Sequence, residues 1–357
     1  GQLGGAERAV YQLVREQLRD PELKPAVLFA QGGGVYETWM RALACEVIAL
    51  DLPHGHALSH FGKIVEAMRP FDIHHFHAGE LLLFLASLRC AQARRIYTHR
   101  AGLINYPLKK RVLHGILGVL LRGFFHGFSG NTRYGARCGA KLYHIPEASF
   151  KVTYNALSTD LMQPMRPPEV VYAELGLRPS LYILGTAANL KAWKRIDRLL
   201  YAVAALADPN LVLLIVGDGI ERERLEALTD KLRLRSQIIF AGRQVHVADY
   251  LQIMNAFCLP SMGLESFGNA AVEAMAMGLP TIVFSDGGGL VEHIQPESSG
   301  FIVANQFQLL ETLVRLRANP ALGRRIGQRA RASVLCRYTP GKVAAAFKSI
   351  YTEIWRE

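Results

Sequence analysis

Short apolar runs rich in Val, Ile, Leu and Phe alternate with longer stretches of helical period from Ala6 onward. This alternation is typical of strand–helix units around a parallel sheet, so we predict an α/β fold. The strands expected in the first half are 26–30, 47–50, 72–76, 95–99 and 124–128. Those expected in the second half are 182–184, 211–216, 238–241, 257–259, 281–284 and 301–303.

Two domains are expected from a chain of 357 residues of which half are apolar, because a single core rarely grows to that size. The proline-rich segment QPMRPP at 163–168 interrupts both helix and strand, and we interpret it as the linker. The predicted domains are 1–165 and 166–338, with a C-terminal helix over 339–357 that packs back on the first domain. The chain opens in the glycine-rich stretch GQLGG, a type of loop that usually follows a strand, so we expect a strand ahead of Gly1.

The segment PSMGLESFGNAAVEAMAMG at 260–278 leaves an expected strand, passes a loop and opens a helix. Both predicted domains are doubly wound, and such sheets bind ligands at the carboxyl ends of their strands. Glu265 lies in the loop and Glu273 on the helix, and two separated acceptors suit a ligand rich in hydroxyl groups. The residues that would present backbone N–H groups to a phosphate at the helix N-terminus are Phe267, Gly268 and Asn269.

A plainer interpretation makes Glu265 a helix cap and Glu273 a solvated surface residue. The neighbours of Glu273 argue against it, because they make the helix apolar on all sides and therefore buried. A buried carboxylate needs partners, which favours the binding interpretation.

Glycines and cations follow three other expected strands. In GTAANLKAWKRIDRLL at 185–200, Lys194 and Arg195 stand at the start of a helix, where cations oppose the helix dipole unless an anion lies between. The alternative is two solvated charges. The turn VGDG, which contains Gly217, is interpreted as packing. The glycines of SDGGGLVEHI at 285–294 either wrap a phosphate or sugar or form a plain turn.

Together these segments resemble the family-4 retaining glycosyltransferases of GT-B fold, also described as glycosyl transferases group 1. The signature of that family is a glutamate, seven residues and a second glutamate, as in Glu265 and Glu273. The resemblance extends over nearly the whole chain and implies two Rossmann-like domains that face each other across a cleft. Its further motifs are GGAER from Gly4, YTHRAG from Tyr97, VTYNALSTD from Val152, KRID from Lys194, VGDG from Val216 and ESFGNAAVEAMAMGLP from Glu265.

The resemblance also implies roles for individual residues. Glu273 would bind the ribose hydroxyls of the donor nucleotide, Glu265 would approach the donor sugar, and Lys194 would hold the diphosphate. His99 of the first domain would face the sugar, so the expected catalytic residues are His99, Lys194 and Glu265. The other donor-binding residues expected are Gly4, Gly5, Asn189, Arg195, Gly217, Arg243, Ser266, Phe267, Gly268 and Asn269.

The sequence departs from the family pattern at Asn189, where an arginine usually stands five residues before the lysine. Asparagine donates hydrogen bonds but does not neutralise charge. We expect Arg195, Lys191 or Arg243 to supply the missing charge. A protein that binds a sugar nucleotide but catalyses weakly is the alternative function.

The implied reaction transfers a hexosyl group with retention of anomeric configuration. The acceptor hydroxyl attacks the face that the nucleoside diphosphate leaves, and the leaving phosphate oxygen takes the proton. Such a reaction depends on positioning and charge stabilisation, so no cofactor and no metal are expected. The expected donor is a UDP-sugar, and the expected acceptor is a glycan or a lipid-linked glycan of bacterial lipopolysaccharide or polysaccharide biosynthesis.

The formal net charge of +11 favours an anionic partner. The segment 106–127 joins an apolar run to six basic residues, as helices at membrane surfaces do, so we expect peripheral association with the inner face of the plasma membrane. The alternative is an ordinary buried helix with one basic edge. A cytoplasmic location is expected, because the sequence shows neither a membrane-spanning run nor a signal-peptide pattern and its five scattered cysteines resemble reduced thiols.

Rival functions draw on the same features. A nucleic-acid-binding module is supported only by charge, because no known motif accompanies it, and no nucleic-acid partner is expected. A sugar phosphorylase or a nucleotide-sugar epimerase would keep the fold with other chemistry, and the glutamate pair argues against the epimerase. His75 and His77 share one face of an expected strand, and we interpret them as lining a cleft rather than binding zinc.

Overall fold

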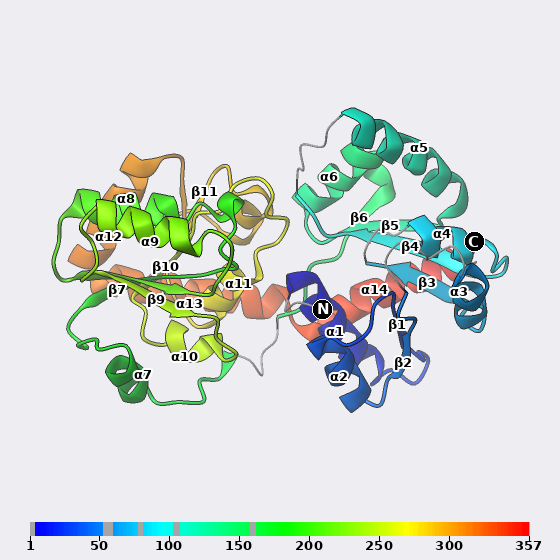
Figure 1. Cartoon of the computed structure of the whole chain (residues 1–357), viewed down its shortest axis with the longest axis horizontal. Coiled ribbons are helices and arrows are strands. Elements are labelled where there is room, and N and C mark those ends of the chain that lie inside the picture. The colour runs from blue at the N-terminus through cyan, green and yellow to red at the C-terminus, as the bar shows by residue number, and fades with distance from the viewer. Residues whose placement is uncertain (1–3, 53–59, 78–80, 103–107, 158–161, 357) are drawn as a thin grey trace. The chain divides into compact units, whose positions relative to one another are not determined.

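Figure 1 shows the computed structural model of the chain, which describes residues 4–52, 60–77, 81–102, 108–157 and 162–356. The chain forms two compact units. Unit 1 comprises Gly1–Ala156 and Pro340–Glu357, and unit 2 comprises Leu157–Thr339. Each unit builds its own core around parallel strands, as the alternating sequence pattern predicts.

Unit 1 contains two parallel sheets. The strands β1 (Ala26–Phe29) and β2 (Glu46–Ala49) pair with each other. The other sheet has the order β3 (Ile73–Phe76), β4 (Arg94–His99), β5 (Gly127–Gly130) and β6 (Phe150–Val152). The helices are α1 (Gly5–Gln17), α2 (Val35–Ala42), α3 (Phe61–Met68), α4 (Leu81–Leu88), α5 (Leu108–Phe124), α6 (Arg133–Tyr143), the short 3-10 helix η2 (Glu147–Ser149) and α14 (Pro340–Arg356).

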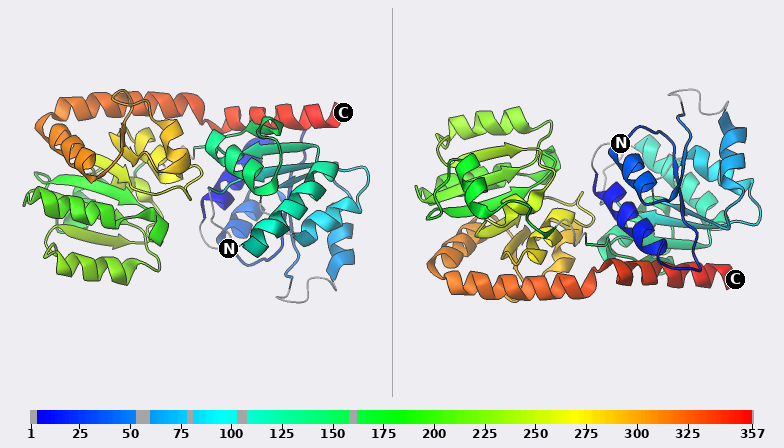
Figure 2. Two further views of the ribbon diagram at one scale, coloured as in Figure 1. Left: turned by 90° about the horizontal axis from the view of Figure 1, so that it is seen from above. Right: turned by 90° about the horizontal axis from the view of Figure 1, so that it is seen from below.

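Strand β4 shows how helices cover both faces of the four-stranded sheet. Successive strand residues point to opposite faces. Tyr97 packs in the core formed with α3 to α6, whereas its neighbour Ile96 packs against Leu13 of α1 and Phe347 of α14. Figure 2 shows α14, in red, along this second face. The C-terminal helix is therefore a structural part of unit 1.

Unit 2 contains one parallel sheet of six strands. Their order is β12 (Phe301–Val303), β11 (Thr281–Phe284), β10 (Ala256–Leu259), β7 (Tyr182–Ala187), β8 (Leu211–Val216) and β9 (Ile238–Gly242). The helices are α7 (Pro168–Glu174), η4 (Ala192–Lys194), α8 (Asp197–Leu206), α9 (Arg222–Lys231), α10 (Val247–Leu251), α11 (Asn269–Ala276), η5 (Gly288–His293), α12 (Gln306–Ala318) and α13 (Pro320–Arg337).

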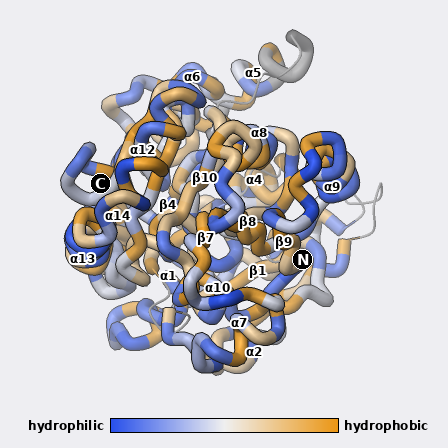
Figure 3. Tube along the Cα trace, turned by 90° about the vertical axis from the view of Figure 1, so that its left-hand side faces the viewer, coloured by the Kyte–Doolittle hydropathy of each residue, from blue (hydrophilic) through white to orange (hydrophobic). Residues whose placement is uncertain are grey.

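The interior strand β8 is buried at every position and reads LVLLIV, as expected for a parallel strand covered on both faces. Helices that flank the sheets alternate hydrophilic and hydrophobic residues, and α9 shows this clearly (Figure 3). Such helices turn one side to the sheet and the other to water. None of the helices within the described ranges is long and apolar enough to cross a bilayer.

The strand order of unit 2 reverses its direction between β7 and β10. In open parallel sheets, ligands bind beyond the carboxyl ends of the two strands that flank this reversal. The register places Ala256 of β10 beside Leu184 of β7, so the loops that follow these strands emerge next to each other. This position is where the site residues predicted in unit 2 should meet.

The α/β prediction is confirmed, and two details differ from the expectation. Phe124 closes α5 instead of opening a strand, since the neighbouring Phe125 packs among the aromatic rings of the helix-side core. The strand β6 was not expected, because its three residues are too short for a periodic signal.

The boundary between the units falls after Ala156, nine residues before the expected end of the first domain at 165. The proline-rich segment belongs to unit 2, because the backbone N–H groups of Met165 and Arg166 donate to Asp249 at 2.6 and 3.2 Å. The Arg166 guanidinium also pairs with that carboxylate at 2.8 Å. These bonds attach the proline-rich segment to α10 of unit 2.

Candidate functional site

The loops after β7 and β10 are joined by their own backbones. The N–H of Met262 in the second loop donates to the carbonyl of Trp193 in the first at 3.0 Å. Arg198, at the start of α8, donates to the carbonyl of Pro260 at 3.3 Å. The two segments that sequence analysis singled out separately thus form one structure.

Lys194 and Glu265 form an ion pair at this junction, and the side chain of each is only 11% exposed. Ser261 donates a hydrogen bond to the same carboxylate oxygen at 3.2 Å. The ammonium group also lies over the ring of Trp193, 4.3 Å from its centroid. A nearly buried lysine is therefore held in place by a carboxylate and an indole, and its charge is balanced while no ligand is bound.

Gly268 forms the entrance to α11 and has a left-handed φ of +78°. A Cβ atom at this position would lie 2.1 Å from Cδ2 of Leu290, so only glycine fits. The first N–H groups of a helix have no partner within the helix and carry the positive end of its dipole. The loop therefore brings backbone close to a place that favours an anion.

Phe267 is fixed by a buried chain of hydrogen bonds. Its carbonyl accepts from Nε2 of His293 at 2.7 Å, and Nδ1 of the same ring accepts from the Tyr338 hydroxyl at 2.8 Å. Arg337 donates to the backbone carbonyl of His293 at 2.7 Å. Burial lowers the pKa of His293 to about 4, so its ring is neutral at pH 7 and has one donor and one acceptor nitrogen.

Sequence reasoning did not single out His293 or Tyr338. The only signal was a histidine inside the glycine-rich motif SDGGGLVEHI. Both side chains are buried, and their hydrogen bonds hold the backbone of the loop at Phe267.

Glu273 lies on α11 and is buried, as are the apolar residues from Ala271 to Ala276 around it. The prediction that this helix is apolar on all sides and enclosed is confirmed. Glu265 is also buried, and its backbone carbonyl accepts from the N–H of Gly289 at 2.9 Å. Both glutamates of the spaced pair are thus buried, and the solvated interpretation of Glu273 is wrong. The neighbouring Ser266 is buried, and Asn269 is partly exposed.

The cations expected around the site differ in their partners. Arg195 has a left-handed backbone with φ +51° and is bound to Asp197 by hydrogen bonds of 3.1 Å, which raise the pKa of the guanidinium. Asn189, Lys191 and Arg243 are exposed. In the described ranges of the chain, neither Lys191 nor Arg243 forms an ion pair, so the structure leaves their charges to solvent.

Gly217 follows β8 with φ +124°, and a Cβ there would lie 1.9 Å from the carbonyl oxygen of Ala188. The turn therefore lets the loops after β7 and β8 approach closely, which supports the packing interpretation. Leu190 strengthens this approach, since its N–H donates to the carbonyl of Asp218 at 2.9 Å.

The expected residues of unit 1 occupy the ends of two elements. His99 ends β4 and is 4% exposed, and burial lowers its pKa to about 4. Its Nδ1 lies 3.3 Å from the Tyr97 hydroxyl, whereas its buried Nε2 has no hydrogen-bond partner among the described residues. Gly4 caps α1, where its carbonyl accepts from the Tyr36 hydroxyl at 3.3 Å, and Gly5 begins that helix.

His75 of β3 and His77, which directly follows this strand, contact other residues of unit 1. His75 is bonded to the Tyr351 hydroxyl of α14 at 2.8 Å and to Thr98 at 2.7 Å, so it ties the C-terminal helix to the sheet. His77 stacks beside it, with ring centroids 3.8 Å apart, and contacts Arg100. Burial lowers the pKa of both rings well below the usual value. No group of three or more His, Cys, Asp and Glu side chains suited to a metal occurs among the residues described.

Comparison with known proteins finds matches to the part of the chain that contains these residues. Residues 173–333 match the family model described as Glycosyl transferases group 1. The chain is 31% identical over 187 residues to N-acetyl-alpha-D-glucosaminyl L-malate synthase of Bacillus anthracis. The aligned residues make up 52% of this chain and 49% of that protein. It is 30% identical over 186 residues to the lipopolysaccharide core biosynthesis glycosyltransferase LpsD of Rhizobium meliloti, covering 52% and 53%. The chain thus spans about half the length of these curated relatives.

The structure resembles that of HepE from Anabaena in complex with UDP. The TM-score is 0.86 over 99% of this chain and 97% of that chain, at 18% sequence identity. HepE is also known in complex with UDP-glucose. The chain has the two-domain, Rossmann-like GT-B fold, and residues 173–333 are similar to the group 1 glycosyltransferases.

Proposed function

We propose that this chain transfers a hexosyl group from a nucleoside-diphosphate sugar, a UDP-sugar, to a glycan or lipid-linked acceptor of bacterial polysaccharide or lipopolysaccharide synthesis. The Lys194–Glu265 pair beside the N-terminus of α11 carries the proposal. It combines a cation and a helix dipole for a diphosphate with two carboxylates for hydroxyl groups, at the reversal of strand order where such sheets bind ligands.

The donor would engage this site in two parts. Glu273 accepts hydrogen bonds from the ribose, while the diphosphate approaches the backbone at Gly268 and draws Lys194 away from Glu265. Glu265 is then released to accept a hydrogen bond from the donor sugar. The Lys194–Glu265 ion pair is thereby replaced by two contacts with the donor, and no unpaired charge is left buried.

The reaction proceeds with retention of configuration and without a metal ion. The bond between the anomeric carbon and the diphosphate oxygen breaks as the acceptor hydroxyl attacks from the same face, and the proton of that hydroxyl passes to the leaving oxygen. Lys194 and the dipole of α11 stabilise the growing negative charge on the diphosphate. His99, Gly4 and Gly5 of unit 1 keep the roles that the resemblance implies, and the neutral ring of His99 has a buried Nε2 suited to a hydrogen bond.

The charge missing at Asn189 is best supplied by Lys191 or Arg243. Arg195 is less suited, because its guanidinium is already bound to Asp197. The same substitution is the observation that favours the alternative function, a sugar-nucleotide-binding protein with weak catalysis.

Calorimetric titration with UDP, GDP and ADP tests the donor site. We expect UDP to bind the wild type and the matched variant Glu311→Gln, in which an exposed glutamate of α12 is changed, but to bind Glu273→Gln at least tenfold more weakly. Failure of all three nucleotides to bind folded protein contradicts the proposal. Release of UDP from UDP-glucose by the wild type, in the presence of acceptor glycans, separates an enzyme from a binding protein.

A further inference from the structure

The exposed apolar side chains of unit 1 gather on two neighbouring helices. On α5, Val112, Ile116 and Val119 are spaced by four and three residues and therefore lie along one side of the helix. Ile116 is 58% exposed and Val119 70%. On α4, Leu81 and Leu85 are four residues apart and also exposed. Nothing in the described part of the chain covers these two stripes.

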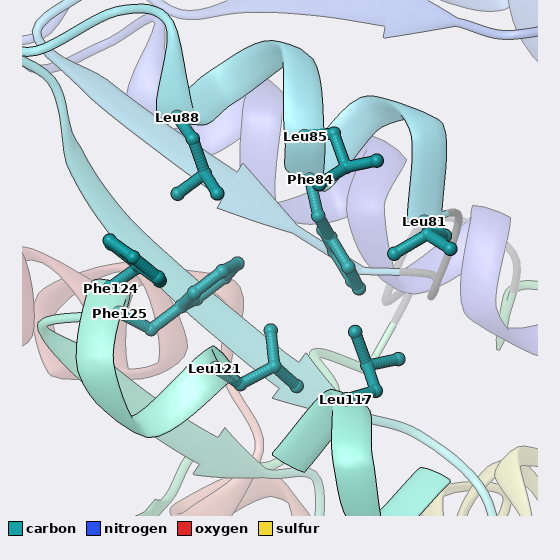
Figure 4. A pocket seen from close by; sticks show the side chains of 8 residues that line it. All are labelled: Leu81, Phe84, Leu85, Leu88, Leu117, Leu121, Phe124 and Phe125. Atoms are coloured by element: carbon teal, nitrogen blue, oxygen red, sulfur yellow. The ribbon is translucent and has the colours of Figure 1, made fainter. Parts of the chain in front are cut away.

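A groove lined by leucine and phenylalanine side chains runs between the two helices (Figure 4). The side chains that line it are Leu81, Phe84, Leu85, Leu88, Leu117, Leu121, Phe124 and Phe125. We call the exposed stripes of the two helices, together with the groove between the helices, the α4–α5 surface. Proteins that stay alone in water rarely expose such an area, so it calls for an occupant.

The segment that carries the α4–α5 surface has charge of one sign. Residues 81–146, which contain α4, α5 and α6, include eleven Lys and Arg and no Asp or Glu. The net charge of the whole chain is also +11, so the rest of the chain is balanced. Arg89, directly after α4, and Arg122 on α5 are exposed, as are Arg133 and Lys141 on α6. A partner that binds the α4–α5 surface must therefore combine an apolar region with negative charge.

We propose that the α4–α5 surface docks on an anionic lipid bilayer, with the apolar stripes in the interface and the arginines at the lipid headgroups. Interfacial helices combine an apolar side with Lys and Arg in this way. A second copy of the chain fits poorly, because two such surfaces would bring like charges face to face. The helices lie on the membrane, and the docking does not depend on the donor chemistry proposed for unit 2.

Flotation of the full chain with lipid vesicles tests this proposal. The vesicles contain either phosphatidylcholine alone or phosphatidylcholine mixed with phosphatidylglycerol. We expect binding to the mixed vesicles, weakened by salt, and at least tenfold weaker binding to phosphatidylcholine alone. Equal binding to both kinds of vesicle, or binding to neither, overturns the proposal.

Paired variants separate the apolar contribution from the charge. Ile116→Ser with Val119→Ser should weaken binding to the mixed vesicles by about tenfold or more, whereas Ile220→Ser with Val245→Ser, two exposed apolar residues of unit 2, should not. Arg89→Gln with Arg122→Gln should weaken it about tenfold, and Arg324→Gln with Arg325→Gln on α13 should not. Equal losses in the control pairs contradict docking through this surface.

Sedimentation velocity distinguishes a second copy as occupant. A dimer that Ile116→Ser with Val119→Ser converts to monomers, together with no vesicle binding, would overturn the proposal in favour of self-association. Vesicle binding is measured without nucleotide and UDP binding without vesicles, so either proposal can fail while the other stands.

Discussion

Helix α11 of unit 2 and helix α5 of unit 1 look alike in sequence, because both contain long apolar runs, but they meet different surroundings. Val272 of α11 is 1% exposed, whereas Val119 of α5 is 70% exposed. Around α11, the enclosing core fixes Glu273 and the loop at Gly268 in one geometry. Around α5, an apolar side is left open beside exposed arginines. Apolar content alone therefore does not distinguish a buried helix that positions site residues from a helix whose apolar side is exposed.

The sharpest test of the first region is the substitution Lys194→Met. Loss of the cation at the diphosphate should reduce turnover of the donor by about 10²–10³-fold, because charge that develops in the transition state loses its partner. The measurement is steady-state release of UDP from UDP-glucose by the folded variant. Lys231→Met on α9, an exposed lysine of the same unit, should retain wild-type turnover. Wild-type turnover by Lys194→Met would show that this lysine does not belong to the site. If Lys194→Met also lost vesicle binding, the donor site and the α4–α5 surface would not be independent of each other.

The two valines compare the helices directly. Val272→Ser buries a hydroxyl and removes methyl contacts, so it should lower the free energy of unfolding by about 3 kcal/mol. Val119→Ser should change it by less than about 0.5 kcal/mol, since the side chain already meets water. Urea unfolding of the two variants measures both values. Equal destabilisation would show that α5 is covered as α11 is, and would break the comparison.

The pH dependence of the free energy of unfolding tests the buried ring of His293, which holds the loop before α11. The unfolded chain protonates His293 below its ordinary pKa of 6.5, whereas the folded chain does so only near 4. The unfolded state therefore binds more protons between these values, and stability falls as the pH is lowered through this window. The loss between pH 7 and pH 4.5 should be about 2 kcal/mol smaller in His293→Gln than in the wild type. Parallel pH profiles of the two proteins would show that the ring is charged in the folded state.

Much of unit 2 could be predicted because its signals are local. The strands at 281–284 and 301–303 have the bounds that their apolar runs indicate, and the buried character of the helix around Glu273 follows from its composition. The carboxylate spacing and the glycine at 268 were also readable. The support from His293 and Tyr338 was not, because a histidine in a turn looks the same whether it is buried or solvated.

The sequence by itself determined the α/β class, most strand positions and the residue types of the candidate site, because these depend on neighbours along the chain. Only the tertiary structure decided which charges meet. It paired Lys194 with Glu265, 71 positions away, and it gave Lys191 and Arg243 no such pair among the residues that the structure describes. It also decided that the apolar side of α5 faces outward beside α4. These outcomes depend on the order of the strands and on the helices that cover each face, and neither is encoded in any single segment.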